Sequence, residues 1–389
     1  MKVAYLSVLP PPGQPAVSGV YRVSQTLLRQ FESMPDLEVE AITLIDGLQK
    51  ETVIKAGSVR YHYLPCKSAG KTLTFYLSEI RQLKRRVRLV GPEVVHGQPT
   101  AEFLLAATGS SLPNVITIHG LVSRESATLA RWRPGWVAAA VRESLHRKAI
   151  KRAQHIISIS SYVEEYLAGL TDCACWPIPN PIEAEFFKIQ PADRVGLRIL
   201  CVGIISERKN QLWLVEACSE LAAAGIPFQC RIVGRYSPGY DAVIGPRVAA
   251  SGLADRIALV GPVGERELMA HYAWSNAVVL PSREETSPLS LIQGMACGRP
   301  VFGAHAAGIP RLLEGGKYGT LFPLDHPGSL ARQLQAFARE GDSYWELAER
   351  SRNYALKNFD PEAVASRTVQ LYRSILAKTF PNQSANHPH

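Results

Sequence analysis

Short apolar runs rich in valine and isoleucine alternate with longer amphipathic stretches along the whole chain of 389 residues. This alternation is typical of βα units, which build parallel sheets covered by helices. It predicts strands at 2–8, 38–44, 58–64, 94–96, 115–119, 155–158, 197–202, 229–233, 257–260, 277–280, 300–303 and 319–322. It predicts helices at 20–31, 73–88, 101–107, 136–152, 162–169, 209–224, 242–251, 265–274, 289–297, 310–314, 329–340, 343–357 and 361–378.

The alternation stops once, at the segment Ile178-Pro-Asn-Pro-Ile-Glu183. Two prolines flank Asn180, and they favour extended backbone and cannot continue a helix. We therefore expect a linker near 179–188 between two Rossmann-like domains. The predicted domains are 1–180, and 181–378 with its last helix packing back on the first domain; a flexible tail follows at 379–389. Ligands of such sheets bind at the carboxyl ends of the strands, so the cleft between the domains is the expected site.

The composition excludes several classes of protein. Apolar residues make up 46% of the chain, too many for intrinsic disorder, and no apolar run approaches the ~18 residues of a membrane span. The apolar stretch at 3–9 is short for a secretory signal and runs into three prolines. Seven scattered cysteines lack the spacing of a zinc site. We expect a protein of the reducing cytoplasm with no metal centre.

The stretch with the most chemical information is PSREETSPLSLIQGMACGRPV, residues 281–301. Ser287 predicts a helix N-cap and Pro288 a first helical residue. The amides of Leu289 and Ser290 then offer an anion site at the positive end of the helix dipole. Glu285 precedes them, where its carboxylate can accept hydrogen bonds from hydroxyls. Such a loop suits a sugar phosphate, although an ordinary βαβ turn has a similar pattern.

This stretch resembles the signature of the retaining glycosyltransferases of family 4, which have the GT-B fold: two Rossmann-like domains with parallel sheets facing across a cleft. The family pattern is a Glu, seven residues, a second Glu, then Ala-Met-Ala-x-Gly-x-Pro-Val. Glu285 fits the first Glu, and Met295–Val301 fits the tail. Gly294 replaces the first Ala, and Gln293 replaces the second Glu, which in the family binds the ribose of the nucleotide. A Gln retains an acceptor oxygen but lacks the charge.

The segment Cys201–Gln211 is similar to the family's strand–loop–helix, in which an Arg and a Lys bind the donor diphosphate. Lys209 matches the Lys, whereas Ile204 stands at the position of the Arg, and the resemblance leaves Arg208 as its substitute. Cations are unfavourable at a helix N-terminus, which favours a functional reason for this pair over a solvated helix start. Two glycines of this domain are also assigned to the donor: Gly203 and Gly234.

In the first domain, Ser18-Gly-Val-Tyr-Arg22 resembles the family's glycine loop, in which Gly19 would approach the donor phosphate or the acceptor. A simple turn is the other interpretation of this segment. Thr117-Ile-His-Gly120 ends a predicted strand, and the resemblance places His119 near the donor sugar and the reaction centre. The resemblance covers about residues 1–378.

The resemblance implies a metal-independent, hexosyltransferase-type enzyme that needs no cofactor. Its donor would be a nucleotide sugar such as a UDP- or GDP-sugar, and its acceptor a glycan or a lipid-linked saccharide of cell-surface or exopolysaccharide synthesis. Lys209, Arg208 and the amides after Pro288 would stabilise the leaving diphosphate. Glu285 would hold sugar hydroxyls, and His119 would orient the sugar.

Three other functions are alternatives to this one. A catalytically weak partner subunit of the same fold is one alternative, because Gln293 and Ile204 both weaken the donor site. A sugar-nucleotide epimerase is a second, and a phosphorylase a third, although no pyridoxal phosphate lysine is identifiable. A nucleic-acid partner is not expected, since no binding motif for one is present.

The net charge of +9 falls in one region. Residues 81–152 hold thirteen Lys and Arg residues and four acidic ones, while the rest of the chain is balanced. A solvated helix face is one interpretation of this region. The other is an anionic acceptor or an anionic membrane surface, which would place the protein peripherally on the inner face of the membrane.

Overall fold

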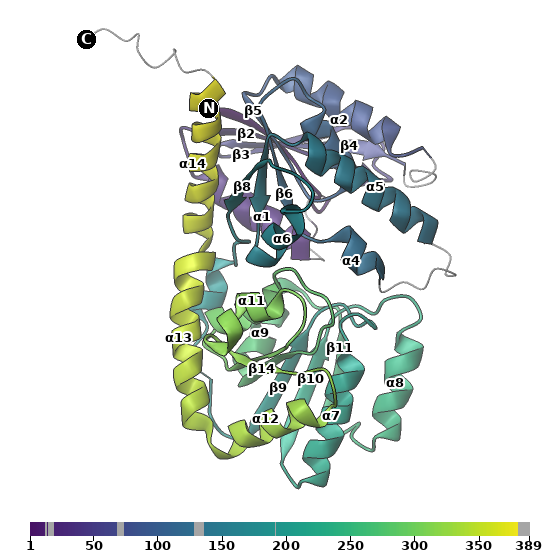
Figure 1. Ribbon diagram of the computed structural model, residues 1–389, viewed down its shortest axis with the longest axis vertical. Helices are drawn as coiled ribbons and strands as arrows, with labels where there is room; N and C mark the ends of the chain where they lie inside the picture. Colours follow the sequence, from purple (N-terminus) through teal and green to yellow (C-terminus); the bar gives the residue numbers. More distant parts are fainter. Residues whose placement is uncertain (12–13, 15–18, 68–73, 128–135, 191, 380–389) are drawn as a thin grey trace, which may run out of the picture. The chain divides into compact units, whose positions relative to one another are not determined.

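The computed structural model describes residues 1–389 except 12–13, 15–18, 68–73, 128–135, 191 and 380–389. The chain divides into two compact units (Figure 1). Unit 1 comprises Met1–Pro181 together with Pro361–His389, and unit 2 comprises Ile182–Asp360. The chain therefore contributes to unit 1 twice. Most of the predicted tail lies outside the described residues.

Unit 1 is built on an eight-stranded sheet with the order β3-β4-β2-β1-β5-β6-β7-β8. Its strands are β1 (Lys2–Leu6), β2 (Glu38–Asp46), β3 (Thr52–Ala56), β4 (Val59–Cys66), β5 (Val94–Gly97), β6 (Asn114–Ile118), β7 (His155–Ser158) and β8 (Ala174–Pro177). Neighbouring strands are parallel except β3 and β4, which are antiparallel. Its helices are α1 (Gly19–Glu32), α2 (Leu77–Val90), α3 (Ala101–Thr108), α4 (Val122–Ala127), α5 (Trp136–Arg152), α6 (Ser161–Leu167) and α14 (Pro361–Thr379).

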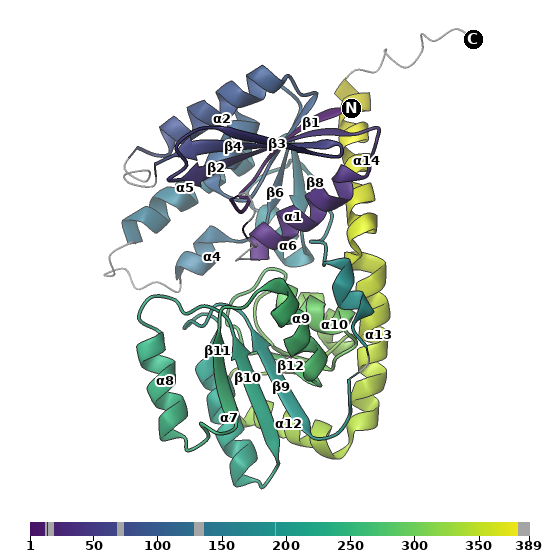
Figure 2. The same cartoon turned by 180° about the vertical axis from the view of Figure 1, so that it is seen from behind.

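Helix α14 is part of the core of unit 1, although it is the last element of the chain. It lies beside α1 in both views (Figures 1 and 2). Val364, Val369 and Tyr372 of α14 are buried with Phe31 of α1 and Tyr5 of β1 in one apolar cluster. The central strands are covered on both faces, which explains their nearly continuous apolar sequences.

Unit 2 is built on a six-stranded, wholly parallel sheet with the order β11-β10-β9-β12-β13-β14. Its strands are β9 (Leu197–Val202), β10 (Phe228–Val233), β11 (Ile257–Gly261), β12 (Ala277–Leu280), β13 (Val301–Ala304) and β14 (Thr320–Phe322). Its α-helices are α7 (Gln211–Ala223), α8 (Asp241–Ala250), α9 (Glu265–Trp274), α10 (Leu289–Ala296), α11 (Ile309–Leu312), α12 (Gly328–Arg339) and α13 (Gly341–Phe359), with short 3-10 helices η1 (Ala184–Lys188) and η2 (Glu314–Gly316).

Every predicted strand overlaps a strand of the structure, and the misses lie at sheet edges. Strand β3 was missed because it is an edge strand whose Val53 and Ile54 are 48% and 40% exposed, so it lacks a buried apolar pattern. Strand β8 was missed because it is a mostly exposed edge strand that ends at Pro177. The short helix α4 was also missed. Residues 184–188, expected within the linker, instead form η1, which buries Phe186 in the core of unit 2.

Among the described residues, no helix combines the length and apolar character that a bilayer span requires.

Candidate functional site

The carboxyl ends of β9 and β10 carry two glycines that lie almost in contact. Gly203 donates its amide to Val233 O (3.0 Å), and Gly234 donates to Gly261 O (2.8 Å). A Cβ on Gly234 would lie 1.9 Å from Gly203 O, and the φ of Gly234 is 149°. Only glycine fits this position. The two glycines assigned to the donor therefore meet at one edge of the unit 2 sheet.

A turn before α7 positions Lys209. The predicted helix at 209–224 begins later than expected, at Gln211, so Lys209 lies in the preceding turn. The carboxamide of Gln211 ties this turn together, because it accepts from Ser206 N (3.1 Å) and donates to Ile204 O (3.0 Å). The Lys209 stem then passes Gly203, with Cε 3.5 Å from the position a Cβ would occupy there.

Glu285 brings the two predicted cations together in unit 2. Lys209 Nζ lies 2.5 Å from Glu285 Oε1, and Arg208 Nη1 lies 3.6 Å from the same oxygen. Arg208 Nη1 also donates to Glu284 O (2.6 Å). The Glu285 side chain is only 9% exposed, and its backbone carbonyl accepts from Gly308 N (2.8 Å). An anionic ligand at this edge would compete with Glu285 for both cations.

The start of α10 differs from the sequence prediction. The helix begins at Leu289 with Pro288 as its N-cap, so Ser287 is not the N-cap and Pro288 is not the first helical residue. The reason is geometric: the first helical hydrogen bond runs from Leu291 N to Pro288 O (3.1 Å). The amides of Leu289 and Ser290 precede that bond, so they remain the anion-binding end of the helix.

Gln293 lies in a different group from the Lys209–Glu285 pair. Its side chain is buried, accepts from the Tyr272 hydroxyl (3.0 Å) and donates to Glu183 Oε2 (3.5 Å). Among the described residues, no hydrogen bond or ion pair joins it to either member of that pair. Its assignment to the donor therefore stays a prediction.

We expect Gln293→Glu to destabilise unit 2 by about 1–3 kcal/mol at pH 8, because it places a second buried carboxylate beside Glu183. The folded chain would then bind a proton to this pair more tightly than the unfolded chain does. The loss should therefore be small near pH 4 and grow as the pH rises. Urea denaturation at pH 4 and pH 8 measures it. Adding Glu183→Gln should restore the stability at pH 8. A double variant as unstable as Gln293→Glu alone would contradict the proposed repulsion between the two carboxylates.

His119 immediately follows β6 in unit 1, at the carboxyl end of that strand. Its Nε2 lies 2.7 Å from Gln98 Oε1. Burial lowers the pKa of His119 to about 4, so the imidazole is neutral at pH 7. Gln98 was not among the predicted site residues. It directly follows β5 at the same sheet edge as His119, and this position is the signal that could have identified it.

Gly19, the remaining predicted site residue, is the exposed first residue of α1. A hydrogen bond between Ser7 Oγ and Ser24 Oγ (2.7 Å) joins the end of β1 to this helix. Ser18 lies outside the described residues. Within the part of the chain that the structure describes, no group of three or more His, Cys, Asp or Glu side chains is placed to hold a metal. Metal independence stays a prediction.

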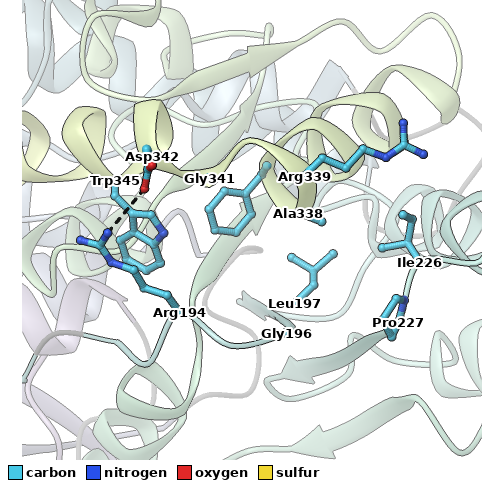
Figure 3. A pocket seen from close by; sticks show the side chains of 11 residues that line it. Arg194, Gly196, Leu197, Ile226, Pro227, Ala338, Arg339, Gly341, Asp342 and Trp345 are labelled. Carbon is cyan, nitrogen blue, oxygen red and sulfur yellow. Dashed lines mark ion pairs between the residues drawn. The ribbon is translucent and has the colours of Figure 1, made fainter.

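Unit 2 also contains a pocket of about 330 Å³ away from this edge (Figure 3). Its wall includes Leu197, the first residue of β9, so it lies at the amino end of a strand whose carboxyl end leads to Gly203. Arg194 lies 3.7 Å from Asp342 and 5.1 Å from the Trp345 ring at this pocket. None of the predicted site residues lines it.

Comparisons with known proteins cover both units. A family profile described as Glycosyltransferase Family 4 matches residues 17–186, and one described as Glycosyl transferases group 1 matches residues 196–340. The putative colanic acid biosynthesis glycosyltransferase WcaL of Salmonella typhimurium is 29% identical over 191 residues, which are 47% of each chain. The alpha-D-kanosaminyltransferase of Streptomyces kanamyceticus is 23% identical over 327 residues, which are 76% of this chain and 81% of that protein. The chain aligns with about half the length of the WcaL proteins.

Solved structures share the fold over nearly the whole chain. Sucrose-phosphate synthase from Thermosynechococcus elongatus has a TM-score of 0.81 at 20% identity, covering 97% of this chain and 99% of that one. Anabaena HepE, solved with UDP and glucose, has a TM-score of 0.72 at 16% identity, covering 96% of this chain and 100% of that one.

Proposed function

Because this chain belongs to the glycosyltransferases of family 4 and group 1 type, with the GT-B fold, we propose that it transfers a hexose from a nucleotide sugar. The proposed acceptor is a glycan or a lipid-linked saccharide. The configuration at the anomeric carbon of the sugar would be retained. The observation that carries the proposal is the pair of cations held on Glu285, close in sequence to the first amides of α10. The names of relatives such as WcaL support a role in exopolysaccharide or cell-surface glycan synthesis.

In the proposed reaction the leaving diphosphate gains negative charge as the bond to the sugar breaks. Lys209 and Arg208 would stabilise that charge, together with the amides of Leu289 and Ser290. Both cations would then turn from Glu285 to the diphosphate, which frees the carboxylate to accept hydrogen bonds from sugar hydroxyls. His119, neutral at pH 7, would orient the sugar or the acceptor through hydrogen bonds and would not act as an acid.

A catalytically weak partner subunit is the second candidate. Two observations favour it: Ile204 stands where the family pattern has an Arg, and the Gln293 side chain is directed at Tyr272 and Glu183. Such a subunit would bind a nucleotide sugar weakly or not at all.

Binding and turnover with a panel of UDP-, GDP- and ADP-sugars test the proposal. We expect one donor to bind and, with lipid or oligosaccharide extracts, to give a labelled glycosylated product. An epimerase would instead convert the nucleotide sugar without an acceptor. If no donor binds and Lys209→Ala changes nothing, the transferase proposal fails.

We also propose that exposed basic residues of α2 and α5 attract an anionic membrane or acceptor. This basic face comprises Arg81, Arg85, Arg88, Arg142, Arg147, Lys148, Lys151 and Arg152. Both helices pack against α3, and the pKa of Lys84 is lowered by burial and by the nearby Arg152 and Arg88. Leu89, 67% exposed, lies on α2 among these charges. Two further basic residues of the region, Arg131 and Arg133, lie outside the described residues.

We expect the protein to bind vesicles that contain anionic lipid and to leave them at 1 M salt, where charges are screened beyond about 3 Å. Each basic residue contributes ~1 kcal/mol at such a surface, so reversing Arg81, Arg85 and Arg88 to Glu should weaken binding at least about a hundredfold. Vesicle flotation measures this. The control makes the same change to Glu at three exposed arginines of unit 2, Arg247, Arg266 and Arg332, and should leave vesicle binding much less affected. Binding that ignores lipid charge and salt would contradict the membrane version.

A further inference from the structure

A chain of buried polar side chains connects α14 to His119 inside unit 1. Tyr372 on α14 places its hydroxyl 2.6 Å from His96 Nδ1. His96 Nε2 lies 2.7 Å from Thr117 Oγ1 and 3.1 Å from Gln98 Nε2. Gln98 Oε1 lies 2.7 Å from His119 Nε2. Gln98 thus stands between two imidazole rings, with its nitrogen on one and its oxygen on the other.

The chemistry of a carboxamide makes the two rings dependent on each other. Its nitrogen can only donate and its oxygen can only accept, whereas the hydroxyls of Tyr372 and Thr117 can do either. His96 Nε2 must therefore hold a lone pair and His96 Nδ1 the proton. His119 must hold its proton on Nε2. Turning the carboxamide over would reverse both assignments at once.

The surroundings keep these rings neutral and fixed in orientation. His96 is fully buried, and burial lowers its pKa to about 3. Its ring meets the rings of Tyr5 and Tyr372 edge-on, at centroid distances of 5.2 and 5.7 Å. Three side chains of this hydrogen-bonded series are each at most 4% exposed: Thr117, Gln98 and Tyr372. Solvent water therefore does not offer His96 alternative hydrogen-bond partners.

We propose that Gln98 is a positioning residue that couples the tautomers of His96 and His119, with Tyr372 anchoring the far end. In this arrangement His119 donates from Nε2 to Gln98 and keeps the Nδ1 lone pair as an acceptor. The tautomer then makes Nδ1, which is buried in this structure, the ring atom of His119 that can accept a hydrogen bond. The chemical consequence for transfer rests on the proposed function, whereas the tautomer coupling does not.

Long-range ¹H–¹⁵N NMR of protein with ¹⁵N-labelled histidine tests the coupling directly, with His96→Asn and His119→Ala used for assignment. In the unsubstituted protein we expect opposite tautomers, with Nδ1–H at His96 and Nε2–H at His119. Tyr372→Phe removes the acceptor of the His96 Nδ1 proton, and a buried unpaired N–H is the costlier defect. We therefore expect both rings to exchange tautomers together in this variant. The same tautomer on both rings, or a change in only one, would overturn the proposal.

A kinetic test separates positioning from structure once a donor is known. We expect Gln98→Leu to lower kcat about tenfold or more with donor Kd unchanged, since a catalytic histidine in the wrong tautomer loses much of its effect. Gln98→Glu, which retains an acceptor for His119 Nε2, should restore part of the rate. The matched control is Gln82→Leu, whose amide donates to Pro65 O (3.0 Å) elsewhere in unit 1. Equal losses in Gln98→Leu and Gln82→Leu, or no rescue by Glu, would contradict positioning.

Discussion

Arg299→Met is expected to destabilise unit 2 by about 3–5 kcal/mol, although Met occupies a similar volume. Arg299 is fully buried and donates to four backbone carbonyls rather than to a carboxylate. Nε bonds Tyr272 O (3.1 Å), Nη1 bonds Cys297 O (3.0 Å), and Nη2 bonds Gln190 O (2.9 Å) and Ala273 O (3.5 Å). These carbonyls lie at or near the ends of α9 and α10 and before β9, where helical partners are missing.

The size of this effect follows from what the substitution leaves behind. Replacing both members of a buried ion pair can be neutral, but here the carbonyls remain after the guanidinium is gone. Tyr272 O keeps a hydrogen bond from Ser275 Oγ (3.0 Å), so the cost falls mainly on the other three carbonyls. Each unsatisfied buried carbonyl costs about 1–3 kcal/mol. Arg299→Lys should restore little of the lost stability, because one ammonium group cannot reach all the carbonyls that the planar guanidinium group bonds.

Amide hydrogen exchange, resolved by unit, measures the change, because a chain of two units need not unfold in one transition. Protection of unit 2 should fall while that of unit 1 is retained. Arg256→Met is the matched control, because the Arg256 side chain is 43% exposed and makes a loose ion pair with Asp255 at 3.9 Å. This substitution should change stability by less than about 0.5 kcal/mol. Unchanged protection in Arg299→Met would contradict the structural role given to this residue.

The fold was predictable where a strand has an apolar run, which includes the edge strands β11 and β14, and not where a strand lacks one. Strands β9 and β12 have the residues expected from their apolar runs, because a short, nearly continuous apolar run is typical of a parallel strand buried on both faces. Strand β3 instead owes its place to antiparallel pairing with β4, with its side chains largely in water. Its sequence therefore contains no buried pattern to detect.

The sequence predicted which residues form the candidate site better than it predicted which of them contact one another. Lys209, Arg208 and Glu285 were expected from the resemblance of their segments to the family pattern, and the structure brings these three together. That Glu285 occupies both cations could not be predicted, because it depends on where two loops 76 residues apart meet. The role of Arg299 was hidden for the same reason: its carbonyl partners come from three separate segments.

Lys209→Ala is expected to lower the transfer rate by about a hundredfold to a thousandfold, or about 3–4 kcal/mol of transition-state stabilisation, as for other removed oxyanion donors. A simpler explanation of any loss is that Glu285, left buried with only the more distant Arg208, repels the diphosphate. The Glu285→Gln background separates the two. If Lys209 only neutralises Glu285, adding Lys209→Ala to Glu285→Gln should cost nothing further.

If Lys209 binds the diphosphate, the second substitution should cost nearly its full effect in that background. We expect this result, because the Lys209 side chain extends along Gly203 to the edge where the amides of α10 also begin. The measurements are kcat for sugar transfer and the Kd of the free nucleoside diphosphate. The matched control is Lys317→Ala, an exposed lysine paired with Glu314 at 3.1 Å, which should change neither. A double variant as active as Glu285→Gln alone would remove Lys209 from the diphosphate site and leave Arg208 as the cation that binds it.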